Sequence, residues 1–139
     1  MKRIFIDANI VIDVLLEREP WMDDALCILS LADRGDIEVY CSSLSLATAS
    51  YFMERVKMPH EVMMDKMDVF CQLCTPTAVD VSVVKKAIQS SFTDFEDALQ
   101  YYSSQTVEAD IIITRNGRDF ANSKIPVMTA AEYLASFIA

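Results

Sequence analysis

The chain alternates between short apolar runs and longer stretches with helical periodicity. Residues 3–7 read Arg-Ile-Phe-Ile-Asp, and residues 111–114 read Ile-Ile-Ile-Thr. Continuous runs of β-branched and aromatic residues are typical of strands buried on both faces of a parallel sheet. We therefore expect these two runs to be neighbouring strands, with residues 3–7 in the centre of the sheet.

Between these runs, apolar residues recur at the three- and four-residue spacing of helices. The expected helices cover residues 8–16, 22–34, 59–74, 83–90, 94–107 and 130–138, and another extends through residue 53 from a serine cap at 42, 43 or 45. Further strands are expected at residues 37–41, 79–81 and 126–128. Because parallel strands need crossover helices, this alternation predicts an α/β protein: a three-layer α/β/α sandwich around a central parallel sheet.

Composition narrows the class of protein. The chain has 139 residues, 53% of them hydrophobic, and no repeat or linker, so residues 1–139 are expected to form a single domain. Its net charge of -9 argues against binding nucleic acid through a broadly basic surface, so any such substrate must be bound locally. Asp7, Asn9 and Asp13 interrupt the apolar residues 4–16, which therefore do not resemble a signal peptide. We expect a soluble, cytoplasmic protein with no membrane association.

The four cysteines are Cys27, Cys41, Cys71 and Cys74, and only the last two form a C-x-x-C pair. A zinc site would need a second pair or histidines at finger spacing, and the single histidine, His60, does not supply them. A redox pair normally opens a helix, whereas this pair is expected to close the helix of residues 59–74. The pattern favours buried free thiols.

Oxygen-bearing side chains gather where strands end. Functional residues of an open parallel sheet collect beyond the carboxyl ends of its strands. Asp7 ends the first predicted strand, and Asp97 lies on the helix that leads into residues 111–114. The cluster expected there comprises Asp7, Asp97, Asn116 and Asp119, with Asp94 and Thr114 in reach. Packed carboxylates repel one another and imply a bound cation, and an oxygen-only set suits Mg²⁺ or Mn²⁺ and hydrolysis at a phosphoryl group.

Other polar residues fit ordinary structural roles. Asn9 is expected to orient Asp7 or to cap the first helix, and Glu96 to favour the N-terminus of its helix. The methionines between residues 53 and 67 are expected in the core or on an interface face. The acids expected to be solvated or to cap helices are Asp13, Asp23, Asp24, Asp33, Asp36, Glu38, Asp65 and Asp68.

Three stretches resemble motifs of the PIN domain, the nuclease fold of bacterial VapC-type toxins. Residues 4–16 resemble its first motif, and residues 94–100 and 109–120 resemble its third and fourth motifs. The resemblance implies that Asp7 and Asp97 bind the metal with Asn116, and that Asp7, Asp97 and Asp119 are catalytic. Thr114, Asn9 and Asp94 would support them. The acid that the family usually has on the helix after the second strand is replaced here by Thr48.

The resemblance implies a metal-dependent endoribonuclease acting on RNA as the toxin of a toxin–antitoxin pair, with a small antitoxin partner and a homodimeric assembly. Arg115 and Arg118 would contact phosphates, or are ordinary surface charges. The alternative is a catalytically weakened PIN module that acts by binding protein or RNA, as Thr48 suggests. A phosphoacceptor receiver domain fits less well, because Asn9 interrupts its acidic pair and Lys124 precedes its strand.

Overall fold

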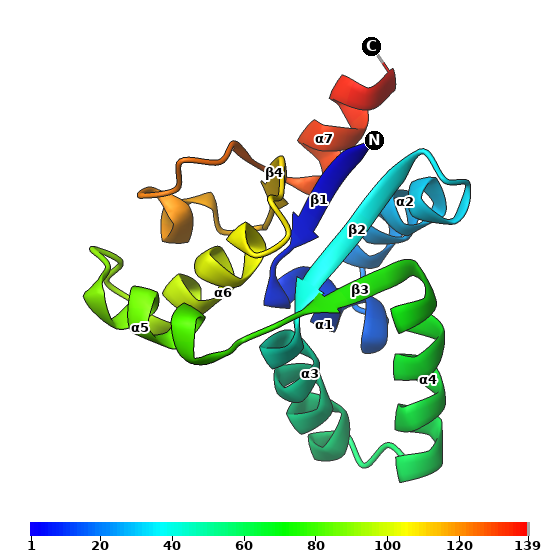
Figure 1. Ribbon diagram of the computed structural model, residues 1–139. Coiled ribbons are helices and arrows are strands. Elements are labelled where there is room, and N and C mark those ends of the chain that lie inside the picture. Colours follow the sequence, from blue (N-terminus) through cyan, green and yellow to red (C-terminus); the bar gives the residue numbers. More distant parts are fainter. Residues whose placement is uncertain (139) are drawn as a thin grey trace.

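A five-stranded parallel sheet runs through the middle of the protein, with helices on both faces (Figure 1). The computed structural model describes residues 1–138. The strand order is β3-β2-β1-β4-β5, so the two apolar runs are neighbouring strands and the first is central, as predicted. The strands are β1 (Lys2–Ile6), β2 (Ile37–Ser42), β3 (Cys74–Thr77), β4 (Ile111–Ile113) and β5 (Val127–Met128).

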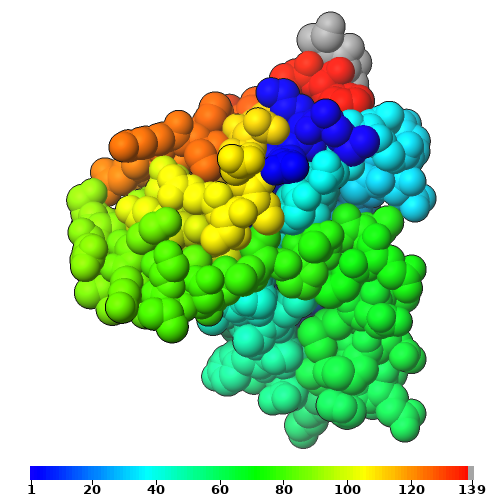
Figure 2. Space-filling view, viewed as in Figure 1, coloured from blue at the N-terminus to red at the C-terminus, as the bar shows by residue number. Residues whose placement is uncertain are grey.

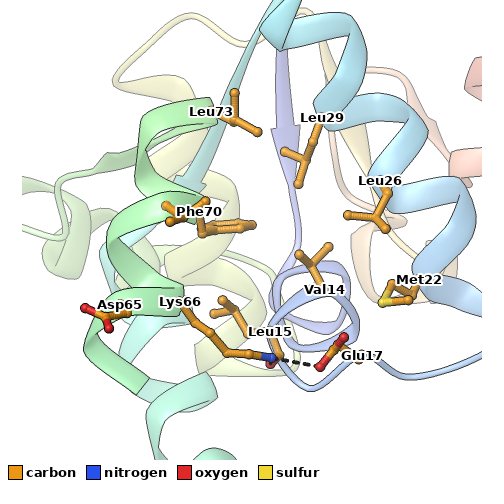
Figure 3. A pocket seen from close by; sticks show the side chains of 11 residues that line it. Val14, Leu15, Glu17, Met22, Leu26, Leu29, Asp65, Lys66, Phe70 and Leu73 are labelled. Atoms are coloured by element: carbon orange, nitrogen blue, oxygen red, sulfur yellow. Dashed lines mark hydrogen bonds and ion pairs between the residues drawn. The ribbon is translucent and has the colours of Figure 1, made fainter. Parts of the chain in front are cut away.

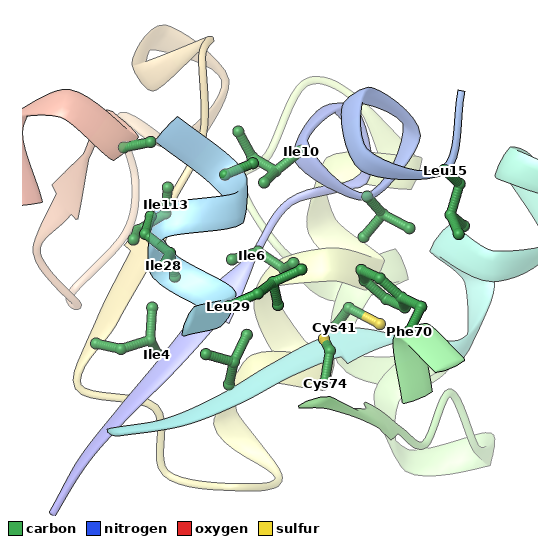
Figure 4. Packing of buried hydrophobic residues seen from close by; sticks show 14 of the residues in the cluster. Ile4, Ile6, Ile10, Leu15, Ile28, Leu29, Cys41, Phe70, Cys74 and Ile113 are labelled. Atoms are coloured by element: carbon green, nitrogen blue, oxygen red, sulfur yellow. The ribbon is translucent and has the colours of Figure 1, made fainter. Parts of the chain in front are cut away.

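Alternation along β1 divides the core into two layers. Ile4 and Ile6 pack into the larger layer, formed by helices α1 to α4 and α7 (Figure 4). Phe5 packs on the opposite face against Tyr101 of α6 and Phe120 of η1. The helical segments are α1 (Ala8–Leu15), α2 (Trp21–Asp33), α3 (Ser43–Arg55), α4 (His60–Leu73), α5 (Val81–Gln89), α6 (Phe95–Gln105), the 3₁₀ segment η1 (Gly117–Phe120) and α7 (Ala130–Ile138). The three-layer prediction is confirmed.

The predicted strand at residues 79–81 is wrong. The third strand is Cys74–Thr77, and α5 already begins at Val81 after the cap residue Asp80, whose Oδ1 accepts from the Val83 N–H at 3.0 Å. β3 contains Pro76, which has no backbone N–H to donate, and β3 lies at the edge of the sheet, where a missing donor is tolerated.

The cysteine prediction holds in part. Cys41 and Cys74 are buried free thiols and Cys71 is half-buried, but Cys27 is exposed on α2. Cys74 opens β3 instead of closing a helix, so the C-x-x-C pair straddles the junction between α4 and β3.

The methionine-rich segment forms part of the core, as expected. Met53 and Met63 are buried, whereas Met64 points outward.

In the space-filling view, α3 and α4 form a protrusion below the sheet (Figure 2). None of the helices within residues 1–138 combines the length and the apolar character that a membrane span requires.

Candidate functional site

Asp7 is fixed at the point where β1 passes into α1. Its backbone N–H continues the sheet by donating to the Ile113 carbonyl at 2.9 Å. Its side chain caps α1, because Oδ1 accepts from the Ala8 N–H at 2.8 Å. The other carboxylate oxygen, Oδ2, accepts from the Thr114 hydroxyl at 2.8 Å. The carboxylate is therefore buried, and it is oriented by the first residue of α1 and by the residue after β4.

Asn9 and Thr114 tie the ends of β1 and β4 together. The Asn9 amide lies 3.3 Å from both Asp7 Oδ2 and Thr114 Oγ1. The Thr114 hydroxyl also accepts from the Asn116 N–H at 3.1 Å, which fixes the turn after β4. Asn9 thus has the orienting role expected for it, and the helix cap belongs to Asp7.

Asp97 lies among other carboxylates at the N-terminus of α6. Asp94 caps this helix, its Oδ1 accepting from the Asp97 N–H at 3.0 Å. Burial is the largest cause that raises the pKa of Asp97, and together with the charges of Asp119, Asp94, Asp7 and Glu96, in that order of importance, it raises this pKa to about 7. Burial likewise raises the pKa of Asp7, against the hydrogen bonds from Thr114 and Ala8. Asp7, Asp97 and Asp119 therefore form one repelling cluster.

This cluster suits a hard cation. In the described part of the chain, no three His, Cys, Asp or Glu side chains are close enough to form a complete metal cage. Mg²⁺ does not need one, because it is usually bound by one or two carboxylates together with water and substrate phosphate. The charge of such an ion would offset the repulsion between these partly buried carboxylates. The residues present fit Mg²⁺ or Mn²⁺.

The exposed residues after β4 border the same region. Asn116, Arg118 and Asp119 line one surface cavity, together with Arg115 and Gly117. Phe120 is buried against the sheet and anchors η1, so Asp119 is held at the edge of the cavity. Thr48 makes none of these contacts: its hydroxyl donates to the Leu44 carbonyl of its own helix at 3.1 Å.

Asp13 corrects the prediction that it is solvated or a cap. Its side chain is fully buried in α1 and accepts from Arg115 at two positions, 2.9 and 3.1 Å, and from Arg18 at 3.2 Å. The Arg115 guanidinium also lies 4.0 Å from the centre of the Trp21 ring. Arg115 is thus held by Asp13, which leaves Arg118 as the freer candidate for phosphate contact.

The sequence model of the PIN domain family matches residues 3–118. The chain belongs to the PIN domain family. PIN domains are generally nucleases, and the matched residues include the three residues expected to bind metal, Asp7, Asp97 and Asn116. Asp119 lies just beyond the match.

Solved structures share this PIN fold at low sequence identity. VapBC2 from Rickettsia felis, bound to a DNA fragment from its promoter, has a TM-score of 0.66 and 15% identity, covering 91% of this chain and 96% of that one. FitAB bound to an IR36 DNA fragment has a TM-score of 0.56 and 15% identity, covering 91% and 94%. No curated protein sequence matches the chain.

Sequence reasoning missed Asp13 and Trp21 as neighbours of the PIN site. Asp13 carries the same signal as Asp7, a carboxylate inside an apolar run. It also follows Asn9 by one helical turn, which places the two on the same face of α1. This signal indicates that Asp13 is buried, but it does not indicate which residue pairs with it.

Proposed function

We propose that this PIN protein is a metal-dependent endoribonuclease that hydrolyses phosphodiester bonds in RNA. The observation that carries the proposal is the repelling cluster of Asp7, Asp97 and Asp119, in which Asp97 has a pKa of about 7. Structural acids are usually placed to avoid such repulsion, whereas metal-binding acids need it to attract the ion. The cluster lies beyond the carboxyl ends of β1 and β4, where open parallel sheets bind their ligands.

Each residue has a distinct part in the proposed reaction. Mg²⁺ or Mn²⁺, when bound, supplies positive charge to the scissile phosphate and lowers the pKa of a bound water. Asp7 presents a fixed carboxylate oxygen, because Thr114 and Ala8 hold it. Asp97 contributes the second carboxylate and Asn116 a neutral amide oxygen. In the proposed reaction Asp119 would orient the attacking water, while Asp94 holds the first turn of α6.

The acidic surface requires that RNA be bound locally. Arg118 is exposed and lines the cavity that also contains Asp119, so it is the residue we assign to phosphate binding. A single arginine beside an acidic cluster implies weak substrate binding with a shallow salt dependence, because few phosphates are neutralised. The proposed cytoplasmic location fits an RNA substrate.

A small antitoxin is the protein partner we propose, on the strength of the resemblance to VapC-type toxins. A groove of about 430 Å³ lies between α2 and α4 and is floored by α1. Leu26, Leu29, Phe70 and Leu73 give it apolar walls, and Lys66 closes one end by donating to Glu17 at 3.0 Å (Figure 3). An apolar helix face of the antitoxin would fit this groove.

Co-purification tests this partner. If a short neighbouring gene encodes the antitoxin, its product should co-purify with the wild-type chain and be lost with Leu26→Asp. Val56→Asp serves as the matched control, since Val56 is exposed and does not line the groove. Loss with both variants, or with neither, would count against the groove as the binding surface.

Thr48 favours the second candidate function, a weakened PIN module that acts by binding. A threonine at this position offers no carboxylate to a metal, and its hydroxyl donates to a backbone carbonyl within α3. With Asn116 also neutral, the proposed ion would have Asp7 and Asp97 as its main charged ligands. Weak metal binding with no cleavage of RNA would favour this alternative.

The decisive experiment is calorimetric titration with Mn²⁺, combined with an RNA cleavage assay. We expect wild type to bind Mn²⁺ and to cleave RNA, and Asp7→Asn and Asp97→Asn each to lose cleavage and most of the binding. Asp33→Asn removes an exposed acid at the end of α2 and should match wild type. Binding of Mn²⁺ that survives both site variants would refute the assignment of the metal site.

A further inference from the structure

A second cavity adjoins the candidate active site. It has a volume of about 410 Å³ and lies between the N-terminal ends of α2 and α7 and the turn after β4. Trp21 and Asp24 line it from α2, Thr129 from the residue before α7, and Arg115 and Asn116 from the turn. Arg115 and Asn116 also line the cavity that contains Arg118 and Asp119. The two cavities are therefore next to each other and share a wall.

That wall carries a rigid, flat surface. The Arg115 guanidinium lies 4.0 Å from the centre of the Trp21 ring, so the two groups stack. Asp13 holds the guanidinium in place through two hydrogen bonds of 2.9 and 3.1 Å. If Arg115 followed a phosphate outward, the fully buried Asp13 carboxylate would lose two of its hydrogen bonds and keep only Arg18 as a charged partner. Arg115 is thus better suited to stacking than to phosphate capture.

The polar groups around this surface suit a base more than a phosphate. Asp24 places an exposed carboxylate on the cavity wall, which repels phosphate but accepts hydrogen bonds from amino groups. Asn116 and Thr129 add an amide and a hydroxyl. Single-stranded RNA is recognised by stacking of splayed bases on aromatic rings and arginine planes, with hydrogen bonds at base edges.

We propose that this cavity is a nucleobase subsite that binds a base with an exocyclic amino group. The base stacks on the Arg115–Trp21 pair and donates its amino protons to Asp24. It belongs to a nucleotide next to the phosphate at the acidic cluster, and in this respect the subsite rests on the proposed ribonuclease function. Uracil has no amino group and is the base that the subsite disfavours.

The fluorescence of Trp21 tests the subsite directly, because Trp21 is the single tryptophan of the chain. The full chain is titrated with the tetranucleotides rA4, rC4 and rU4 in EDTA, so that no cleavage occurs. We expect saturable quenching by rA4 and rC4, with rU4 binding about tenfold more weakly, the factor typical of one hydrogen bond to a charged group. Absence of saturable quenching, or equal affinity for all three, would overturn the proposal.

Two variants on one helix separate recognition from folding. Asp24→Asn should bring the ratio between rA4 and rU4 close to one, because an amide accepts more weakly than a carboxylate. Asp33→Asn removes another exposed acid of α2 outside the cavity and should keep the wild-type ratio. A ratio unchanged by Asp24→Asn would overturn the role of Asp24 and with it the subsite.

The same measurements distinguish this subsite from the proposed function. Wild type that cleaves RNA with Mn²⁺ but shows no base-dependent quenching would refute the subsite alone. Base-dependent quenching without cleavage would refute the ribonuclease and leave the subsite standing as a binding site.

Discussion

Replacement of Asp13 by asparagine tests whether the buried ion pair stabilises the fold. The substitution keeps the shape of the side chain but removes its charge, and it places an amide donor against the donors of Arg115 or Arg18. Removing one partner of a buried pair costs about 3–5 kcal/mol. Here the arginine side chains remain 26% and 38% exposed, so water solvates part of the charge left behind. We therefore expect a loss of about 2–3 kcal/mol in the free energy of unfolding.

The loss is large enough to measure by thermal and urea denaturation followed by circular dichroism. For a chain of this length, 1 kcal/mol corresponds to about 3–4 °C, so the expected drop in Tm is about 6–12 °C. Asp36→Asn is the matched control, because it breaks the Arg34–Asp36 pair, whose side chains are 63% and 41% exposed. Exposed pairs contribute about 0–1 kcal/mol, so this control should lower Tm by at most about 4 °C.

A double-mutant cycle isolates the contribution of the pair. Asp13→Asn and Arg115→Gln should together cost clearly less than the sum of their separate losses, with a coupling of about 1–3 kcal/mol. Additive losses, or an Asp13→Asn variant as stable as Asp36→Asn, would refute the view that this buried carboxylate is paired and structurally important.

Three other predictions follow from the site and its surroundings. In EDTA, the free energy of unfolding should rise by about 1–2 kcal/mol when the pH falls from 8 to 5, a value already reduced for solvent screening. The reason is that folded Asp97, with a pKa of about 7, binds a proton that Asp97 of the unfolded chain, with its ordinary pKa of 3.8, releases. Denaturation of Asp97→Asn should show a flatter dependence on pH across this range. Thr48→Glu should raise Mn²⁺ affinity and RNA cleavage at limiting Mg²⁺, whereas the double variant with Asp7→Asn should be inactive. Unchanged Mn²⁺ affinity of Thr48→Glu in a titration would show that Thr48 does not face the metal. The exposed Val62 and Met64 of α4 support homodimerisation, and sedimentation as a monomer at micromolar concentration would contradict it.

The sequence predicts best the features that depend on short-range pattern. The runs that became β1 and β4 are continuous and apolar, and a carboxylate at the end of such a run, as at Asp7, indicated the site. β3 was not predicted, because a proline such as Pro76 argues against a strand. Only the strand order shows that β3 lies at an edge of the sheet, where proline is tolerated. Strand order depends on contacts distant in sequence, which periodicity does not report.

The arrangement around Asp13 was beyond the sequence for the same reason. Its partner Arg115 lies 102 residues away, and an arginine next to an acidic motif suggests phosphate binding before it suggests an internal pair. Asp13 was expected to be solvated or to cap a helix, because most acids of so acidic a chain are solvated. Only the fold brings α1 and the turn after β4 together, and it changes the interpretation of both residues.

The turn after β4 illustrates how the fold can hold repelling carboxylates in place. Thr114 is bound to Asp7, and the next residue, Arg115, is bound to Asp13, so α1 and the residue before it hold the start of the turn at two points. At its other end, Phe120 is buried against the sheet. With both ends fixed, the backbone of the turn keeps Asp119 near Asp97, and the charge of Asp119 contributes to the raised pKa of Asp97. The unfavourable charge is thus held by contacts that do not themselves depend on a metal, and this leaves a folded site in which the proposed cation is needed for chemistry but not for folding.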